Sequence, residues 1–155
     1  MQILIEDFVI DEAGDIDILQ LVDLQSKMAY ETEGVTLDED IVEKGILAVI
    51  EDDTKGKYYK IVQQGKMVGC MLNTFEWSDW RNGYVLWIQS LYFLPQYRRR
   101  GLFKAVFQYV RGTVQKNKQL KGIRLYVDKK NEPAIEAYKS VGMTNQHYEM
   151  FEWLK

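Results

Sequence analysis

A run of basic residues around a single glycine is the part of this sequence best suited to bind a charged ligand. It reads Arg98-Arg99-Arg100-Gly101-Leu102-Phe103, after an apolar stretch that closes on Pro95 and before an amphipathic stretch from Lys104 to Val114. A strand, a tight turn and a helix start in this order gather backbone N–H groups at the positive end of a helix dipole, which suits a pyrophosphate. A basic loop that is simply solvated is the alternative interpretation.

A second patterned segment follows the next apolar strand pattern, Ile123 to Val127. Its distinctive residues are Asn131, Ala134, Tyr138, Gly142 and Met143. Together the two segments resemble the GNAT superfamily of acyl-coenzyme A dependent N-acetyltransferases, in which an [RQ]-x-x-G-x-[GA] turn precedes an N-x-x-A-x-x-x-Y-x-x-x-G-[FM] segment. The turn matches at Arg98 and Gly101 and departs at Phe103, where the family usually has Gly or Ala. The resemblance covers residues 83–155 well and earlier residues only by element order.

The resemblance implies acetyl-coenzyme A as the co-substrate, with no metal, and a place for each part of it. The pyrophosphate would lie on the turn and the first helical residues, which are Arg98, Arg99, Arg100, Gly101, Leu102, Phe103 and Lys104. The pantetheine arm would pair with the backbone of Leu91, Tyr92, Phe93 and Leu94, and the N–H of Phe93 or Leu94 would be an oxyanion donor. Asn131 and Ala134 would add coenzyme contacts. The alternative, that these strand side chains are core, is compatible because the chemistry uses main chain.

Tyr138 is the candidate general acid. By resemblance it contacts the coenzyme and donates a proton to the departing thiolate, and a phenol with a pKa of about 10 is neutral and able to donate at pH 7. The alternative is a helix residue that packs on the sheet with its hydroxyl at the rim.

The general base departs from the family pattern. Many members carry Glu at the position of Gln89, and an amide cannot accept a proton. Glu76, at the end of the preceding predicted strand, is the nearest carboxylate by strand order, and a water is another candidate. An exposed strand-end charge is an equally good interpretation of Glu76.

Acceptor recognition in this fold usually falls to the first two helices and one loop. The candidate substrate-binding residues here are Tyr30, Glu31, Glu33, Trp77, Trp80 and Gln89. Aromatic faces beside carboxylates suit a cationic amine. The acids could instead be solvated, and the tryptophans could cover the core or form a dimer contact.

Composition narrows the class of protein. With 155 residues, 46% apolar and 28% charged, the chain predicts one globular domain spanning 1–155. Its net charge of −3 disfavours nucleic acid and membrane surfaces as partners, so the Arg cluster favours a small anionic ligand. The single Cys70 allows no intrachain disulfide, and the single His147 with one Cys gives no zinc spacing. A cytoplasmic location is the default expectation, since no signal peptide or apolar span is evident.

Periodicity and turn residues predict the order of elements. We expect strands over 2–10, 58–63, 67–77, 84–94, 123–127 and 146–154, and helices over 15–28, 38–50, 102–118 and 132–141. Thr36 with Glu39 would form a capping box for the second helix. This order, β-α-α-β-β-β-α-β-α-β, predicts an α+β fold with a mixed, mostly antiparallel central sheet and helices on both faces, as in GNAT proteins.

The primary functional hypothesis is therefore an N-acetyltransferase that moves the acetyl group of acetyl-coenzyme A to a primary amine by direct attack in a ternary complex. A small cationic amine is the favoured acceptor, and a protein or peptide amine is an alternative. An inactive acyl-coenzyme A binding module is the rival, because Gln89 and Phe103 depart from the family. A homodimer is compatible with the sequence.

Overall fold

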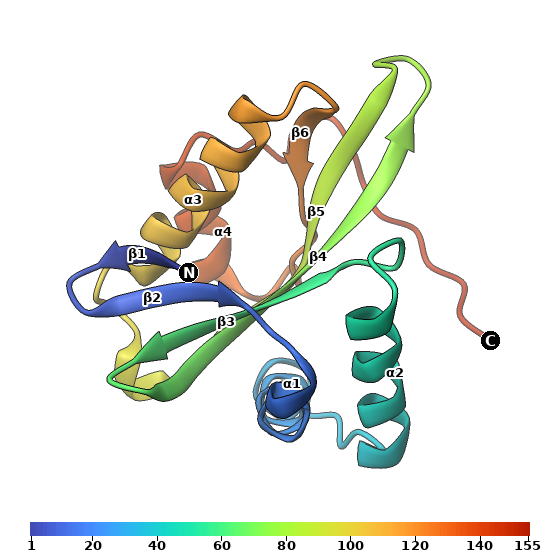
Figure 1. Cartoon of the computed structure of the whole chain (residues 1–155). Helices are drawn as coiled ribbons and strands as arrows, with labels where there is room; N and C mark the ends of the chain where they lie inside the picture. Colours follow the sequence, from blue (N-terminus) through green and yellow to red (C-terminus); the bar gives the residue numbers. More distant parts are fainter. The chain divides into compact units, whose positions relative to one another are not determined.

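The computed structural model describes all 155 residues, which form two compact units, Met1–Leu125 and Tyr126–Lys155. The first unit is a six-stranded sheet in the order β1-β2-β3-β4-β5-β6 with three α-helices (Figure 1). Its strands are β1 (Gln2–Ile5), β2 (Phe8–Glu12), β3 (Lys57–Gln63), β4 (Lys66–Ser78), β5 (Gly83–Phe93) and β6 (Leu120–Arg124). Its helices are α1 (Ile18–Glu33), α2 (Glu39–Glu51) and α3 (Leu102–Lys116), with 3₁₀ turns η1 (Asp15–Asp17) and η2 (Pro95–Tyr97). The second unit contains α4 (Glu132–Ser140).

Every neighbouring pair of strands is antiparallel except β5 and β6, which are parallel. Short turns suffice for antiparallel neighbours, whereas a parallel pair needs a crossover, which α3 provides here. The turn at Gln64 and Gly65 has φ of 49° and 78°, as a two-residue hairpin turn of this hand requires. The predicted α+β class and its mostly antiparallel sheet are confirmed.

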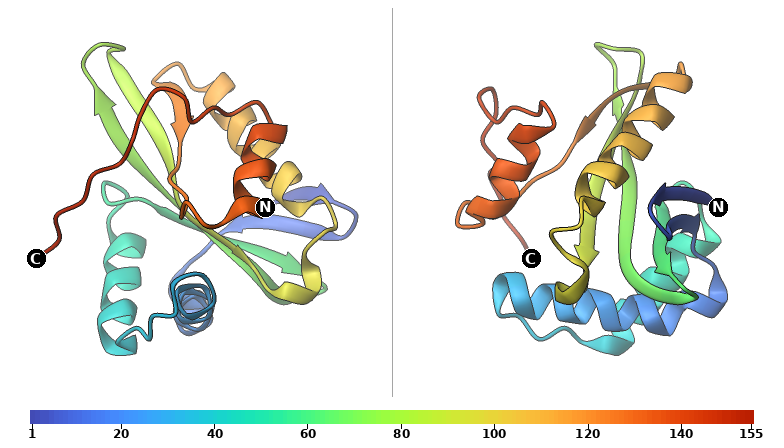
Figure 2. Two further views of the ribbon diagram at one scale, coloured as in Figure 1. Left: turned by 180° about the vertical axis from the view of Figure 1, so that it is seen from behind. Right: turned by 90° about the vertical axis from the view of Figure 1, so that its left-hand side faces the viewer.

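The helices of the first unit cover both faces of the sheet. On one face α1 and α2 pack over a core that includes Leu21, Ile46 and Cys70. On the other face α3 packs over a second core that includes Ile61 and Val106. Figure 2 shows from two further sides that α1 and α2 lie together and that α3 lies apart from them.

The helix boundaries follow local signals, with one correction. Gly34 ends α1 in the left-handed conformation at φ 66°, and its N–H donates to carbonyls of the last turn. The predicted Thr36 cap of the second helix is wrong. Asp38 is the N-cap, because its carboxylate accepts from the N–H groups of Asp40 and Ile41 at 3.0 and 3.3 Å.

The strands near the two ends of the chain differ from the sequence prediction. The single strand expected over 2–10 is a hairpin, because Glu6 takes φ 52° and the chain reverses between Ile5 and Phe8. The strand expected over 123–127 lies earlier, at Leu120–Arg124, since its pairing with β5 ends at Arg124. The strand expected over 146–154 is absent, because those residues pair with no neighbouring strand.

The second unit, described by itself, holds a short helix with a signal at each end. The Asn131 side chain accepts from the N–H of Ala134 at 3.3 Å, and Pro133 lies in the first turn, where its missing N–H costs nothing. Gly142 takes φ 91° after the last turn, and the N–H of Met143 donates to the Tyr138 carbonyl at 3.1 Å. The motif that carries the resemblance is thus also a capped helix. No helix of the protein has the length and apolarity needed to cross a bilayer.

Candidate active site

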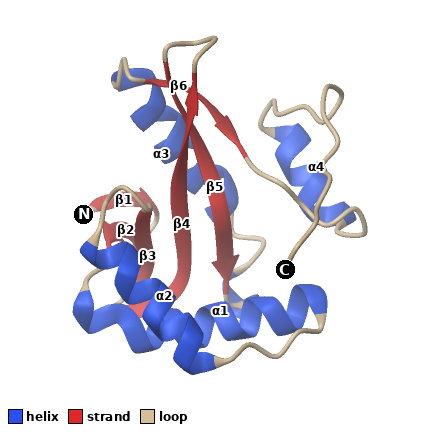
Figure 3. Ribbon diagram, turned by 90° about the vertical axis from the view of Figure 1, so that its right-hand side faces the viewer, coloured by secondary structure: helices blue, strands red, loops and turns tan.

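The central opening of the sheet lies where β5 and β6 part. Their pairing runs from Tyr84 to Trp87, whereas β5 continues to Phe93 (Figure 3). The N–H of Leu94 donates to the Val68 carbonyl of β4 at 2.9 Å. Because main-chain groups alternate in direction along a strand, those of Leu91 and Phe93 point away from β4, toward the side that β6 has left. An extended ligand can pair with such an edge.

A β-bulge sits in β5 just before this edge. Leu72 of β4 pairs with Ser90, whereas the next residue, Asn73, pairs with Ile88, so Gln89 is the extra residue. Bulges re-aim side chains and are common beside active sites. The Gln89 side chain is exposed, and its Oε1 accepts from the Thr74 hydroxyl at 3.3 Å.

The basic loop after β5 leads into the N-terminus of α3 as the sequence predicts. Arg99 and Gly101 both take positive φ, 61° and 77°, and Gly101 is the N-cap of α3. No side chain caps this helix, and no acid lies in its first turn. The loop therefore presents the positive end of a helix with cationic side chains around it, a site suited to phosphate. Phe103 is half-buried and lies against Phe107, with ring centroids 6.3 Å apart.

Arg98 does not extend from this loop as an unoccupied cation. Its Nη1 and Nη2 pair with the Glu31 carboxylate, the second at 3.0 Å, and its Nε donates to the Phe93 carbonyl at 2.9 Å. Tyr92 donates its hydroxyl proton to Glu31 at 2.9 Å and has the Arg98 guanidinium 5.2 Å above its ring. A residue expected to hold the coenzyme thus pairs with one expected to hold the amine. Both Glu31 oxygens are engaged, so Glu31 is a poor partner for a cationic substrate.

Glu76, the candidate base, lies on the face of the sheet that α1 and α2 cover. Its Oε1 accepts from Trp87 Nε1 at 3.1 Å and pairs with Arg124 Nη1 at 2.7 Å. The Trp87 hydrogen bond, followed by that of Arg124, lowers the pKa of Glu76 below its usual value. A carboxylate with a lowered pKa accepts a proton less readily, so these contacts weaken Glu76 as a base.

The remaining substrate candidates do not converge on one place. Alternation along β4 puts Trp77 on the opposite face from Glu76, with its ring 5.0 Å from that of Tyr84. Trp80 lies in the β4–β5 turn and is 89% exposed. Tyr30 and Glu33 are exposed on the last turns of α1.

Tyr138, the candidate acid, belongs to the second unit. It is half-buried, and burial raises the pKa of its hydroxyl above the usual value. The phenol is therefore fully protonated at neutral pH, as a proton donor must be.

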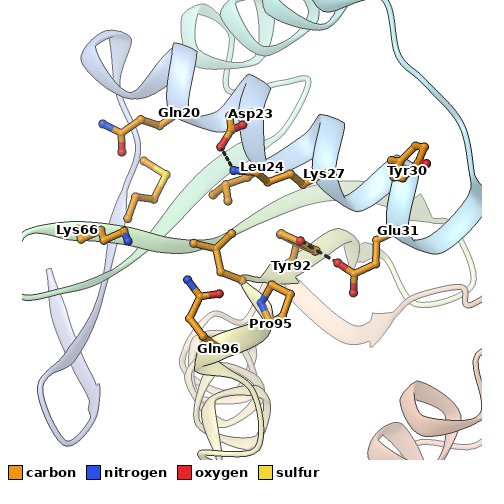
Figure 4. Close-up of a pocket in the computed structure, with 12 residues that line it drawn as sticks. Gln20, Asp23, Leu24, Lys27, Tyr30, Glu31, Lys66, Tyr92, Pro95 and Gln96 are labelled. Carbon is orange, nitrogen blue, oxygen red and sulfur yellow. Dashed lines mark hydrogen bonds and ion pairs between the residues drawn. The ribbon is translucent and has the colours of Figure 1, made fainter.

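A cavity of about 650 Å³ lies between α1 and the end of β5 (Figure 4). Its wall combines side chains of α1 with the start of β4 and with η2, and it includes Tyr30, Glu31 and Tyr92. Lys27 and Asp23 form an ion pair on its helical side at 2.5 Å, and Lys66 faces them from β4 (Figure 4). Mixed charges around an apolar floor would suit a small polar molecule.

Two features of the site were missed by sequence reasoning. Arg124 and Trp87 hold Glu76, and Gln25 of α1 donates to the Ser90 hydroxyl of β5 at 3.0 Å. No local pattern signals these contacts, because Glu76 and Arg124 lie 48 residues apart in the sequence and Gln25 and Ser90 lie 65 residues apart. Cys70 is fully buried, and burial raises the pKa of its thiol to about 12, so it is unsuited to act as a nucleophile.

Comparisons with known proteins agree with this geometry. The sequence profile of the Acetyltransferase (GNAT) family matches residues 17–143. The structure is similar to that of a possible acetyltransferase from Clostridium difficile 630, at 40% identity and TM-score 0.89 over 97% of this chain and 99% of the other. A search of curated proteins gives no significant match.

More distant structures share the fold. An aminoglycoside acetyltransferase from an uncultured soil metagenomic sample, solved with sisomicin, has a TM-score of 0.74 at 14% identity over 96% and 97% of the two chains. Aminoglycoside N-acetyltransferase AAC(6')-Iy, solved with coenzyme A, has a TM-score of 0.77 at 12% identity over 96% and 95%. The family profile spans most of the chain, and the Clostridium protein matches it over nearly its whole length. The protein therefore belongs to the GNAT acetyltransferase family.

Proposed function

We propose that the protein is an N-acetyltransferase that transfers the acetyl group of acetyl-coenzyme A to a primary amine by direct attack in a ternary complex. The observation that carries the proposal is the unpaired edge of β5, Leu91–Phe93, which leads directly into the uncapped N-terminus of α3. A strand edge followed along the chain by a helix N-terminus suits a ligand with an extended amide arm and a pyrophosphate.

The loop residues fit such a ligand. In the proposal, backbone N–H groups from Arg99 to Lys104 hold the pyrophosphate, with the exposed side chains of Arg99, Arg100 and Lys104 adding charge. Gly101 leaves the approach open, since an added Cβ would find Ile5 Cδ1 as its nearest protein atom, at 3.6 Å. The coenzyme supplies an activated acyl thioester.

Other residues of the chain have separate tasks in the proposal. The main chain of Leu91 and Phe93 orients the pantetheine arm. The N–H of Phe93 stabilises negative charge on the carbonyl oxygen under attack, since the Leu94 N–H already donates to the Val68 carbonyl. Tyr138 supplies a proton to the departing sulfur, and Asn131 and Ala134 are further coenzyme contacts.

The acceptor is proposed to be a small amine that reacts in its neutral form. Gln89 cannot take a proton, and the pKa of Glu76 is lowered by Trp87 and Arg124, so neither residue is a strong base. The aminoglycoside acetyltransferases with this fold make polyamino sugars one class to test. A cytoplasmic location and a homodimer remain parts of the proposal.

A thiol-release assay tests the proposal. Acetyl-coenzyme A is incubated with aminoglycosides, polyamines, amino acids and peptides with free N-termini, and a disulfide reagent detects free coenzyme A. The buried Cys70 keeps the folded enzyme from adding to the signal. We expect amine-dependent release and an acetylated product in mass spectrometry. Failure of coenzyme A to bind in calorimetry would refute the proposal.

The rival function is an acyl-coenzyme A binding module without catalysis. The observation in its favour is the ion pair of Glu76 with Arg124. The nearest carboxylate is therefore already engaged, and the strand position that usually carries the base holds the amide Gln89. Coenzyme binding with no thiol release on any amine would favour this rival.

A further inference from the structure

The Arg98 side chain is fully engaged inside the first unit, although the sequence motif assigns it to the coenzyme. Each of its three guanidinium nitrogens donates to a protein atom, two to Glu31 and one to the Phe93 carbonyl. The guanidinium also lies over the Tyr92 ring. The planar guanidinium makes a two-point contact with the Glu31 carboxylate and is therefore held in one orientation. Rotation of the Arg98 side chain toward phosphate would break several hydrogen bonds at once.

The position of Glu31 explains why its carboxylate needs a cationic partner. Glu31 lies in the last turn of α1, where the negative end of the helix dipole disfavours a carboxylate, and that turn contains no basic residue. Arg98, which follows η2, and the Tyr92 hydroxyl, at the end of β5, compensate this charge. The hydrogen bond from Arg98 is the main cause that lowers the pKa of Glu31, so the pair stays charged through neutral pH.

The loop that follows Arg98 needs such an anchor. Arg99, a non-glycine residue, takes φ 61°, and Gly101 takes 77°, so two of the three residues before α3 are in the left-handed region. A conformation of this kind persists when surrounding contacts fix it. The Arg98 contacts fix the loop at its first residue, to α1 on one side and to β5 on the other.

We propose that Glu31 is a positioning residue that holds the phosphate loop in its binding conformation through Arg98, and that Arg98 stays on Glu31 when the coenzyme binds. The inference rests on the proposed function only in naming coenzyme A as the ligand of the loop. It makes the contact between Arg98 and the last turn of α1, rather than a direct contact of Arg98 with phosphate, the determinant of coenzyme affinity.

Three variants test the latch formed by Glu31, Tyr92 and Arg98: Glu31→Gln, Arg98→Gln and the double variant. The matched control is Glu43→Gln, the same change at an exposed position of α2. Coenzyme A affinity is measured by calorimetry, and hydrogen exchange of the Arg99–Leu102 amides is measured without ligand. Where turnover is found, KM for acetyl-coenzyme A and kcat are compared.

We expect Glu31→Gln to weaken coenzyme affinity by about threefold to thirtyfold, the range for a charge-assisted hydrogen bond at a half-exposed site. The double variant should lose no more than either single variant, because both break one latch. Loop amides should exchange faster in all three variants but not in Glu43→Gln. KM should rise while kcat at saturation stays unchanged.

Two results would overturn the inference. If Arg98 binds phosphate directly, Glu31→Gln releases the cation, and affinity stays the same or improves. Additive losses in the double variant would likewise show that the two residues act separately. If the wild type binds no coenzyme A, the proposed function fails, whereas the exchange measurement still decides the latch.

Discussion

Two glycines of α3 should respond to the same substitution with opposite signs. Gly101 caps the helix at φ 77°, a conformation that strains any residue with a Cβ. Gly112 lies inside the helix, and an added Cβ there would meet no atom within 4 Å. Alanine at each position therefore separates the effect of the left-handed cap from the general effect of adding a methyl group.

The expected magnitudes follow from the backbone. Alanine at position 101 costs about 1–2 kcal/mol for the left-handed conformation and regains about 0.4–1 kcal/mol from a less flexible unfolded chain. Little steric cost adds, because Ile5 Cδ1 is 3.6 Å from the added atom. Gly101→Ala should thus destabilise by roughly 1 kcal/mol, and Gly112→Ala should stabilise by about 0.5–1 kcal/mol. In a chain of this size each shifts Tm by about 2–4 °C.

Thermal and denaturant unfolding measure both changes, and calorimetric titration with coenzyme A measures the loop. We expect Gly101→Ala to lower Tm and weaken coenzyme binding, whereas Gly112→Ala raises Tm and leaves binding unchanged. Gly101→Asn should keep more stability than Gly101→Ala, since Asn tolerates the left-handed region. A Gly101→Ala protein as stable as the wild type would refute the assigned loop geometry.

Three further residues, Tyr138, Glu76 and Cys70, give outcomes that can be tested. Tyr138→Phe should keep Tm and coenzyme affinity but lower kcat by about ten-fold to ten-thousand-fold, the range for general acid–base groups, and an unchanged kcat with chemistry rate-limiting would make Tyr138 structural. Glu76→Gln should leave the shape of the kcat/KM pH profile intact, rising toward the pKa of the amine, because Trp87 and Arg124 lower the pKa of this carboxyl; an acidic limb lost in the variant would identify Glu76 as the base. The ionised Glu76 carboxylate should stabilise the fold above the carboxyl pKa of the unfolded chain, and this stabilisation should be lost as the pH falls through the lower pKa of the folded protein. Tm measured against pH in the wild type and in Glu76→Gln tests this expectation. Cys70, with a thiol pKa of about 12, should resist alkylation at pH 8 until denaturant unfolds the protein, and rapid native-state labelling would contradict its burial.

Local signals in the sequence predicted much of the fold because they act within a few residues. The turn at Gln64-Gly65, the cap of α3 at Gly101 and the helix between Asn131 and Gly142 depend on φ values and hydrogen bonds between near neighbours. The Asp38 cap was misassigned to Thr36 because both residues precede the same helix and both can accept from its first turn.

Strand existence was harder to predict at the ends of the chain, because a strand requires a partner. The segment 146–154 has strand-like alternation but no neighbour to receive its hydrogen bonds. Residues 2–10 look like one strand until Glu6 turns the chain back on itself. Alternation of apolar and polar residues predicts which side chains share a face, but it does not show whether a neighbouring strand is present to continue the hydrogen bonding.

By itself, the sequence determined the α+β class, the order of the central elements and a basic, glycine-capped loop before α3. The tertiary structure alone decided what the charges near that loop do. Arg98 meets Glu31 across 67 residues because the loop after η2 lies beside the last turn of α1. Glu76 meets Arg124 across 48 residues because β4 and β6 lie on either side of β5. Side-chain type indicates what a residue can bind, whereas the packing of the elements decides which partner lies within contact distance of it.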